Sequence, residues 1–260
     1  MSIKNKLASL ACFIVFALSK NSHAQSQQYY YELRIYHYNH NQQDELLDDY
    51  FKNAYKPAMN KLGFKIGAFR PIGNDTASNK KLYIFIPFKS LNEWEKTEQQ
   101  LQKNNNYVTA ARGYTNSLHN NPPYTRFETI FMRGFKDMPS YAIPPLKSSK
   151  DERIYELRSY ESATDKLFKN KVDMFNRGGE IALFHKLNFN AVFYGEVIFG
   201  AQMPNLIYMT SFENKKERDE HWKTFGNDPE WKKLSALPEY QNNVSHIDIV
   251  FLRSLSYSDF

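Results

Sequence analysis

An internal repeat constrains the fold of this 260-residue chain more than any other feature of its sequence. The letters YELRIY, which begin at Tyr31, recur as YELRSY at Tyr155, 124 residues later. Three more segments recur in the same order at offsets of 120 to 125 residues: 59–64 at 184–189, 82–88 at 206–212, and 126–133 at 246–253. Ordered matches at a nearly constant offset indicate that one domain is present twice.

The repeat sets the expected domain boundaries. We predict a first domain at residues 25–135 and a second at residues 151–260. Residues 136–150, between them, carry three prolines and three serines, a composition that is typical of a linker. Each domain, of about 110 residues, is long enough to bury a hydrophobic core without disulfide bonds.

Both copies are predicted to contain the same strands in the same order. Aromatic content and the alternation of apolar with polar residues predict strands in the first copy at residues 29–38, 64–72, 82–88 and 124–133. The corresponding strands of the second copy are expected at residues 153–160, 187–199, 206–212 and 244–253.

Two helices are predicted in each copy. Apolar residues at helical spacing indicate a helix at residues 42–62, which Pro57 should kink. Ser90 and Glu93 form a capping box that should begin a second helix, and their counterparts 124 residues later should do the same. Gly178-Gly179 should interrupt the first helix of the second copy.

The resulting order, βαββαβ in each copy, is the order of a ferredoxin-like unit. In such a unit both helices cover one face of the sheet, and the other face needs a separate cover. The second copy is the natural cover for the first. The sequence therefore predicts an α+β fold in which two tandem ferredoxin-like units form an eight-stranded α+β barrel within one chain.

The repeated YELRxY opening and the letters FGNDPEW at residues 225–231 resemble the NIPSNAP family. That family belongs to the dimeric α+β barrel superfamily, together with antibiotic-biosynthesis monooxygenases and the haem-binding chlorite dismutases. The resemblance implies the barrel fold and implies no particular reaction, because NIPSNAP proteins share no established activity. The first copy has Asn104-Asn105-Asn106-Tyr107 in place of the FGNDPEW letters, so a site built on them should be single.

The N-terminus has the layout of a signal peptide. Lys4 and Lys6 precede an uncharged apolar block at residues 7–18, and small residues follow up to Ala24. A helix needs about 20 apolar residues to span a bilayer, so we expect no stable membrane anchor. We predict an exported bacterial protein, periplasmic or extracellular, that is cleaved near Ala24 and Gln25.

The charge of the chain argues against a nucleic-acid partner. The 34 basic and 28 acidic residues give a formal net charge of +6. Loss of residues 1–24 removes Lys4, Lys6 and Lys20, which leaves 34 − 3 = 31 basic against 28 acidic residues. The resulting net charge of 31 − 28 = +3 is too small to indicate a basic surface that binds nucleic acid.

The first strand of each copy carries a polar stripe. Alternation places Glu32, Arg34 and Tyr36 on one face of the strand, and their counterparts Glu156, Arg158 and Tyr160 repeat the pattern. Because helices should pack on the apolar face, we expect both stripes to point into the barrel. There the arginines could bind an anionic or carbonyl group while the glutamates act as acid or base. The alternative is that glutamate and arginine pair across the two sheets and hold the barrel closed.

Histidines and the last strands supply further candidates. Arg126, Glu128, His246 and Asp248 alternate on the final strand of each copy, and they could belong to a site or to the same ion-pair lock. The resemblance to haem-binding barrels makes His185 a possible axial ligand, although a structural role is the alternative and no cofactor is expected. His37 and His40 lack a third ligand at suitable spacing, so no metal site is predicted.

The sequence thus favours a protein that binds a small organic molecule in the barrel cavity. Phosphate-binding, serine-hydrolase and zinc-protease signatures do not occur in the chain. Two alternatives stay open: a cofactor-free or haem-dependent enzyme of monooxygenase or isomerase type, and a non-catalytic assembly module of the cell envelope. We also expect homo-oligomers that form through an exposed edge strand or the outer helices.

Overall fold

The computed structural model describes residues 27–74 and 78–260. The predicted signal peptide at residues 1–24 lies outside the described residues, and it stays a prediction. None of the helices in the described segments is long and apolar enough to cross a membrane.

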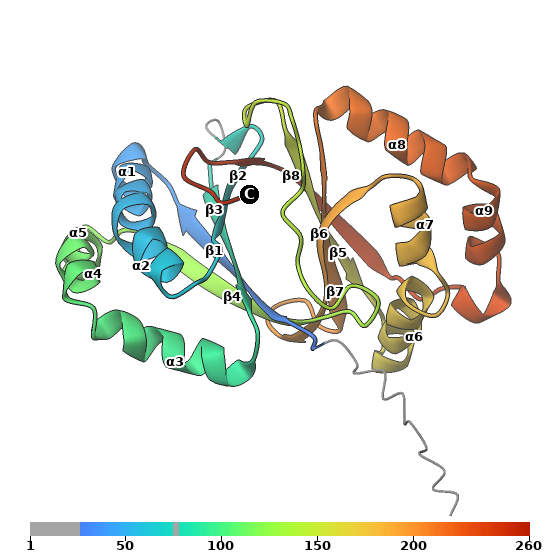
Figure 1. Cartoon of the computed structure of the whole chain (residues 1–260), viewed down its shortest axis with the longest axis horizontal. Helices are drawn as coiled ribbons and strands as arrows, with labels where there is room; N and C mark the ends of the chain where they lie inside the picture. The colour runs from blue at the N-terminus through green and yellow to red at the C-terminus, as the bar shows by residue number, and fades with distance from the viewer. Residues whose placement is uncertain (1–26, 75–77) are drawn as a thin grey trace, which may run out of the picture.

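The strands of the described residues close into one antiparallel barrel in the order β1-β3-β2-β8-β5-β7-β6-β4 (Figure 1). The first copy supplies β1 (Tyr30–Tyr38), β2 (Gly67–Pro71), β3 (Lys80–Phe88) and β4 (Arg126–Gly134). The second copy supplies β5 (Ile154–Glu161), β6 (Asn190–Phe199), β7 (Asn205–Phe212) and β8 (His246–Ser254). The predicted α+β barrel of two ferredoxin-like units is confirmed.

The two copies are joined at both sheet edges. β2 pairs with β8, and β4 pairs with β6, so each copy completes the sheet of the other. Because the order is closed, no strand of the described chain is left at a sheet edge. The expectation that an exposed edge strand would carry oligomerisation is therefore wrong, since closure removes sheet edges.

Helices cover the outside of the barrel in two groups, which Figure 1 shows on opposite sides. The first copy contributes α1 (Asn41–Asp49), η1 (Tyr50–Tyr55), α2 (Lys56–Lys61), α3 (Leu91–Gln102), α4 (Asn105–Ala110) and α5 (Arg112–Thr115). The second copy contributes α6 (Asp165–Phe175), α7 (Glu180–Lys186), α8 (Lys215–Asn227), α9 (Pro229–Ser235) and the 3-10 turn η3 (Pro238–Tyr240).

The predicted kink at Pro57 takes the form of a π-helical segment. α1 passes into η1, which is π-helical, and α2 begins just before Pro57. Proline has no backbone N–H, and its ring collides with the carbonyl one turn earlier in a regular α-helix. The wider π turn is one way to accommodate such a defect within a continuous helix.

The predicted helix boundaries follow local chemistry. The side chain of Ser90 accepts a hydrogen bond of 3.1 Å from the backbone N–H of Glu93 at the start of α3. Asn214 accepts the equivalent bond from Glu217, at 2.9 Å, at the start of α8. Gly179 separates α6 from α7 with a φ of +89°, a conformation that glycine adopts at little cost.

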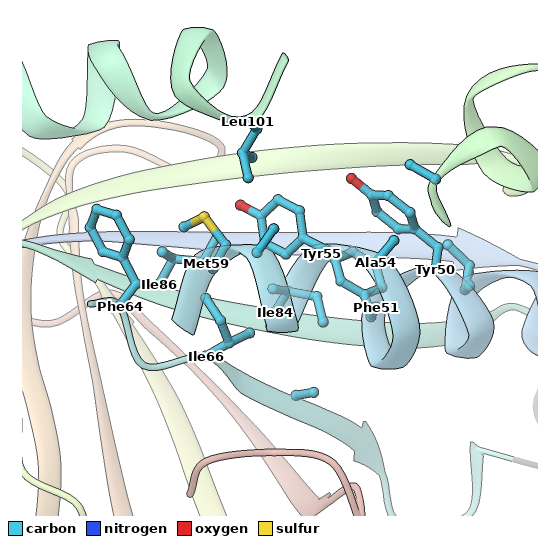
Figure 2. Packing of buried hydrophobic residues seen from close by; sticks show 14 of the residues in the cluster. Tyr50, Phe51, Ala54, Tyr55, Met59, Phe64, Ile66, Ile84, Ile86 and Leu101 are labelled. Carbon is cyan, nitrogen blue, oxygen red and sulfur yellow. The ribbon is translucent and has the colours of Figure 1, made fainter. Parts of the chain in front are cut away.

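Both faces of the sheet are buried over most of its area, although side chains near the start of β8 are exposed. Outside the barrel, Figure 2 shows Phe51, Tyr55 and Met59 of the first-copy helices lying over Ile84 and Ile86 of β3. Inside the barrel a second apolar cluster contains residues of both copies, and its rings of Phe85 and Phe193 stack with centroids 4.6 Å apart. A strand such as β3 therefore has a continuous apolar sequence rather than an alternating one.

One end of the barrel interior is filled by aromatic side chains and by the residues between β4 and β5. Phe260 is 2% exposed and contacts Phe85, Phe69 and Tyr141. The backbone N–H of Ala142 bonds to the carbonyl of Val192 at 2.9 Å. The residues expected to act as a linker have no helix or strand, yet they pack against the barrel.

Candidate functional site

The other end of the barrel opens into a cavity of about 420 Å³. We call this cavity the barrel mouth. It is lined by inward-facing residues of both copies and by the β6–β7 turn: Leu33, Ile35, Lys81, Tyr83, Glu128, Ile130, Leu157, Ser159, Ala201, Gln202, Ile207, Asp248, Ile249 and Val250. Its volume lies in the usual range for small-molecule sites, which is about 300–1,000 Å³.

The barrel mouth has apolar walls and two carboxylates. Leu33, Leu157 and Ile207 belong to the apolar cluster inside the barrel. Glu128 on β4 and Asp248 on β8 occupy corresponding positions of the repeat and both line the cavity. A ligand with an apolar body and one hydrogen-bonding group matches such a lining.

Each carboxylate of the barrel mouth has a histidine partner. His37 Nε2 lies 2.8 Å from Glu128 Oε1, and its Nδ1 lies 3.2 Å from Asn79 Oδ1. His246 Nε2 lies 3.2 Å from Asp248 Oδ1. Both histidine–carboxylate pairs therefore lie beside the cavity and can hydrogen-bond to polar groups there.

Tyr83 supplies a hydroxyl between these carboxylates. Burial and, to a smaller extent, the negative charges of Glu128 and Asp248 together raise its pKa to about 12. The hydroxyl therefore stays protonated in the neutral range and can donate a hydrogen bond to a ligand.

Ligand atoms of Glu161, His246 and Asp248 lie within 4.8 Å of one another beside the barrel mouth. Both His246 and Asp248 are about half exposed, with side-chain exposures of 57% and 47%. Solvated carboxylates gather at protein surfaces without any metal, and we assign no ion to this group.

The predicted orientation of the Glu/Arg/Tyr stripes is wrong. Tyr36 packs in the helix-side cluster of the first copy, and Tyr160 packs in that of the second. Their apolar neighbours Leu33 and Leu157 lie inside the barrel instead. The reason is that the narrow interior cannot hydrate charges, which are costly without water or partners. The stripes lie under the helices, where polar helix residues can meet them.

In the second copy the stripe forms a saturated network. Glu156 is fully buried and accepts hydrogen bonds from Arg158 at 2.7 Å, from Arg218 at 2.7 and 2.8 Å, and from the Trp222 indole N–H at 2.8 Å. Arg158 lies over the Trp222 ring, 3.6 Å from its centroid. Tyr160 accepts a hydrogen bond from Arg158 at 3.1 Å. This arrangement matches the ion-pair alternative, here between sheet and helix rather than between sheets.

In the first copy the same stripe has fewer partners. Arg34 donates two hydrogen bonds to Glu32, at 2.8 and 3.1 Å, and its guanidinium lies 5.5 Å from the Tyr55 ring centroid. Glu32 is buried and adjoins a cavity of about 300 Å³ between β1 and α3.

His185 lies in the last turn of α7, and its cavity is lined by none of the stripe residues and by none of the barrel-mouth residues. It lines a separate cavity of about 330 Å³ with apolar residues that include Met138, Ile143 and Phe189. No lysine or arginine is among the described residues of that lining, and Asp137 would repel the carboxylates of a haem. The residues around His185 do not fit haem.

Comparison with known proteins places the second copy in a family. Residues 155–259 match the NIPSNAP family. The second copy is a NIPSNAP domain. The first copy repeats the strand order of this NIPSNAP domain and completes its barrel. Among curated proteins, none is similar enough to the chain to be matched.

Solved structures share the fold over most of the chain. A protein from Lactobacillus acidophilus, proposed to be a monooxygenase, has a TM-score of 0.57 at 12% identity and covers 87% of this chain and 94% of its own. A similarly described protein from Fusobacterium nucleatum has a TM-score of 0.57 at 8% identity, with 88% and 94% covered. An anthrone oxidase-like protein reaches 0.50 at 9% identity, with 89% and 93% covered. Identities this low show a common barrel and nothing of the activity.

Sequence reasoning named two residues of the barrel mouth, Glu128 and Asp248, and His246 beside it. Lys81 and Ser159 were not predicted as lining residues, and Ser159 was missed because the two faces of its strand were assigned the wrong way round. The available signal was that the inner residues at the open ends of β3 and β5 become polar, whereas those deeper in the barrel are apolar or aromatic.

Proposed function

We propose that the protein binds a small organic molecule in the barrel mouth. The molecule has an apolar body and a hydroxyl or amino group. The observation that carries the proposal is the cavity of about 420 Å³ whose walls are apolar and whose rim holds Glu128, Asp248 and the Tyr83 hydroxyl. The carboxylates would accept hydrogen bonds from the ligand, and Tyr83 would donate one. The apolar body would displace water from Leu33, Leu157 and Ile207.

A change that fills the cavity tests this proposal. Val250 faces the barrel mouth, whereas Ile247 on the same strand does not line it and is 44% exposed. Val250→Phe should abolish the rise in melting temperature that a binding phenol or aromatic amine causes, because a ligand that prefers the folded state raises that temperature. Ile247→Phe is the matched control and should retain the rise.

The panel should include phenols, aromatic amines, benzoates and neutral aromatic hydrocarbons. We expect the first two classes to stabilise the protein more than the benzoates, since the lining has two carboxylates, Glu128 and Asp248, against one cation, Lys81. If no member of the first two classes raises the melting temperature at millimolar concentration, the proposal fails. It fails equally if Val250→Phe, shown to be folded by circular dichroism, binds as well as the unchanged protein.

A second function, oxygenation or isomerisation of the bound molecule without a cofactor, is favoured by the paired His37 and Glu128. This pair could accept the proton of a bound phenol or enol. The fold shared with proteins proposed to be monooxygenases supports the same idea by analogy alone. At saturating ligand concentration, oxygen consumption or product formation should fall in Glu128→Gln by a larger factor than the affinity for the ligand does.

We further propose that the protein works outside the cytoplasm, because residues 1–24 carry the charge and apolar pattern of a signal peptide. Fractionation of cells that express the full chain, followed by N-terminal sequencing, should find the mature protein in the periplasm or the medium, beginning at Gln25. Recovery of an uncleaved cytoplasmic chain would contradict this.

A further inference from the structure

The repeat allows the two stripes to be compared position by position. An offset of 124 residues relates Glu32 to Glu156, and it also relates the cap of α3 at Ser90 to the cap of α8 at Asn214. On the helices, Trp94 therefore corresponds to Arg218 and Glu98 corresponds to Trp222. The two copies place different side chains over the same buried glutamate.

In the second copy the space over the glutamate is filled by the protein itself. The guanidinium of Arg218 donates hydrogen bonds to both carboxylate oxygens of Glu156, and the indole N–H of Trp222 donates another. Arg218 is only 15% exposed, so this cation is held largely out of water.

In the first copy the corresponding space is a cavity of about 300 Å³, which we call the α3 pocket. Its lining consists of Glu32, Arg34, Tyr55, Phe88, Trp94, Glu95, Thr97, Glu98 and Leu101. Figure 2 shows two of its walls, Tyr55 from η1 and Leu101 from α3. The ring of Trp94 is held in place by Phe131, with centroids 5.1 Å apart.

The α3 pocket carries more negative than positive charge. Three carboxylates, Glu32, Glu95 and Glu98, line it against one basic side chain, Arg34, among the described residues. Glu98 also accepts a hydrogen bond from Gln102, which is neutral and leaves the charge unbalanced. In the second copy the added cation Arg218 pairs with Glu156 and with Asp219, so that Arg158 and Arg218 balance these two carboxylates.

We propose that the α3 pocket binds a planar organic cation of the amidinium or guanidinium type. The cation would take the place over Glu32 that the Arg218 guanidinium takes over Glu156, with Glu98 as a second acceptor. Trp94 and Tyr55 supply aromatic faces, which attract cations. Planar cations with several N–H donors suit carboxylates better than an ammonium does, because they can bond to both oxygens. This site is separate from the barrel mouth and does not depend on the function proposed there.

Isothermal titration calorimetry of the full protein with benzamidine tests the proposal. Benzamide has the same shape without the charge, and benzylamine has the charge without the planar pair of N–H groups. We expect benzamidine to bind at least tenfold more tightly than either. Binding should weaken as salt rises, because the attraction is electrostatic and the pocket is open to solvent.

Matched variants locate the binding. Glu98→Gln should weaken the binding of benzamidine at least tenfold. The double variant Trp94→Arg/Glu98→Trp, which imports the side chains of the second copy, should also weaken it at least tenfold. Asp219→Asn, at the position of α8 that corresponds to Glu95, is the control and should leave binding unchanged. Glu98 is exposed, so its variant should fold normally, which circular dichroism can verify.

Two results would overturn the proposal. One is the absence of benzamidine binding at millimolar concentration to the unchanged protein. The other is equal binding to the Glu98→Gln variant and to the double exchange. Val250→Phe, which fills the barrel mouth, should bind benzamidine normally, so failure at one site is distinguishable from failure at the other.

Discussion

Glu156 and Glu32 occupy the same position of the repeat but have different hydrogen-bond partners. Glu156→Gln leaves Arg158 buried without a counter-charge and leaves Arg218 with Asp219 as its one acidic partner. Losing one member of a buried ion pair costs about 3–5 kcal/mol. Glu32→Gln leaves one partly exposed arginine, and it should cost less. Urea unfolding of the two variants measures the difference. Equal losses would show that Arg218 and Trp222 add nothing to the fold.

The same network predicts how stability depends on pH. Burial acts to raise the pKa of Glu156, but the hydrogen bond from Arg218 and the charge of Arg158 lower it below its usual value. A lowered folded-state pKa gives stability that is full above the unfolded value, about 4.3 for glutamate, and is lost as the pH falls through the folded value. The free energy of unfolding should therefore drop below about pH 4, and less so in Glu156→Gln.

Tyr83 reports on the carboxylates of the barrel mouth. Its pKa is raised to about 12 by burial and then by Glu128 and Asp248. Glu128→Gln removes one negative charge and should lower that pKa. NMR titration with ¹³C-labelled tyrosine measures the shift, with Glu239→Gln as a control remote from the barrel mouth. An unchanged pKa would mean that the charge of Glu128 does not reach the Tyr83 hydroxyl.

Strand identity could be predicted from the sequence, but the direction of each strand face could not. Glu32 and Leu33 alternate, and alternation alone does not say which of them faces the barrel. The usual rule, that the apolar face packs under helices, fails because both faces of this sheet are buried. The helix-side surface tolerates charge only where a partner such as Arg218 is supplied by another element, and that partner is 62 residues away from Glu156.

Helix boundaries were predictable at the level of the element, because they depend on local chemistry. The caps at Ser90 and Asn214 and the break at Gly179 are all as expected. The π-helical form of η1 was not predictable, since proline permits several responses and the choice depends on packing against β1 and β3.

Two glycines give opposite predictions. Gly179→Ala should destabilise the protein by about 1 kcal/mol, because an L-residue is strained at a φ of +89°. Gly226→Ala should stabilise it by about 0.5–1 kcal/mol, because Gly226 lies in α8 with no atom within 4 Å of an added Cβ. Thermal unfolding of both variants tests the pair. A stabilising Gly179→Ala would contradict the left-handed break between α6 and α7.

At the scale of the molecule, the closed barrel predicts what happens when the chain is cut. Cleavage at an engineered protease site in the exposed residues 136–137 should leave the two fragments associated, because β2 with β8 and β4 with β6 still pair. Size-exclusion chromatography without denaturant should show one peak that contains both fragments. Separate elution would mean that the paired edges cannot hold the barrel without the covalent connection.

The repeat made the overall architecture predictable, because duplicated βαββαβ units need each other as covers. It could not reveal that the sheets join edge to edge, since the ladders β2–β8 and β4–β6 link segments far apart in the chain. It could not reveal the barrel mouth either, because a cavity is what remains when the side chains of six strands and a turn have been placed.

The pairing of two copies within one chain has a consequence for how such a barrel can change. In a barrel made of two identical subunits, a substitution appears twice, so a half that opens a pocket opens the same pocket in its partner. Here Trp94 and Arg218 occupy equivalent places and differ. One half can keep its charged side chains buried and paired and so stabilise the fold, while the other half is free to lose contacts and to acquire a ligand.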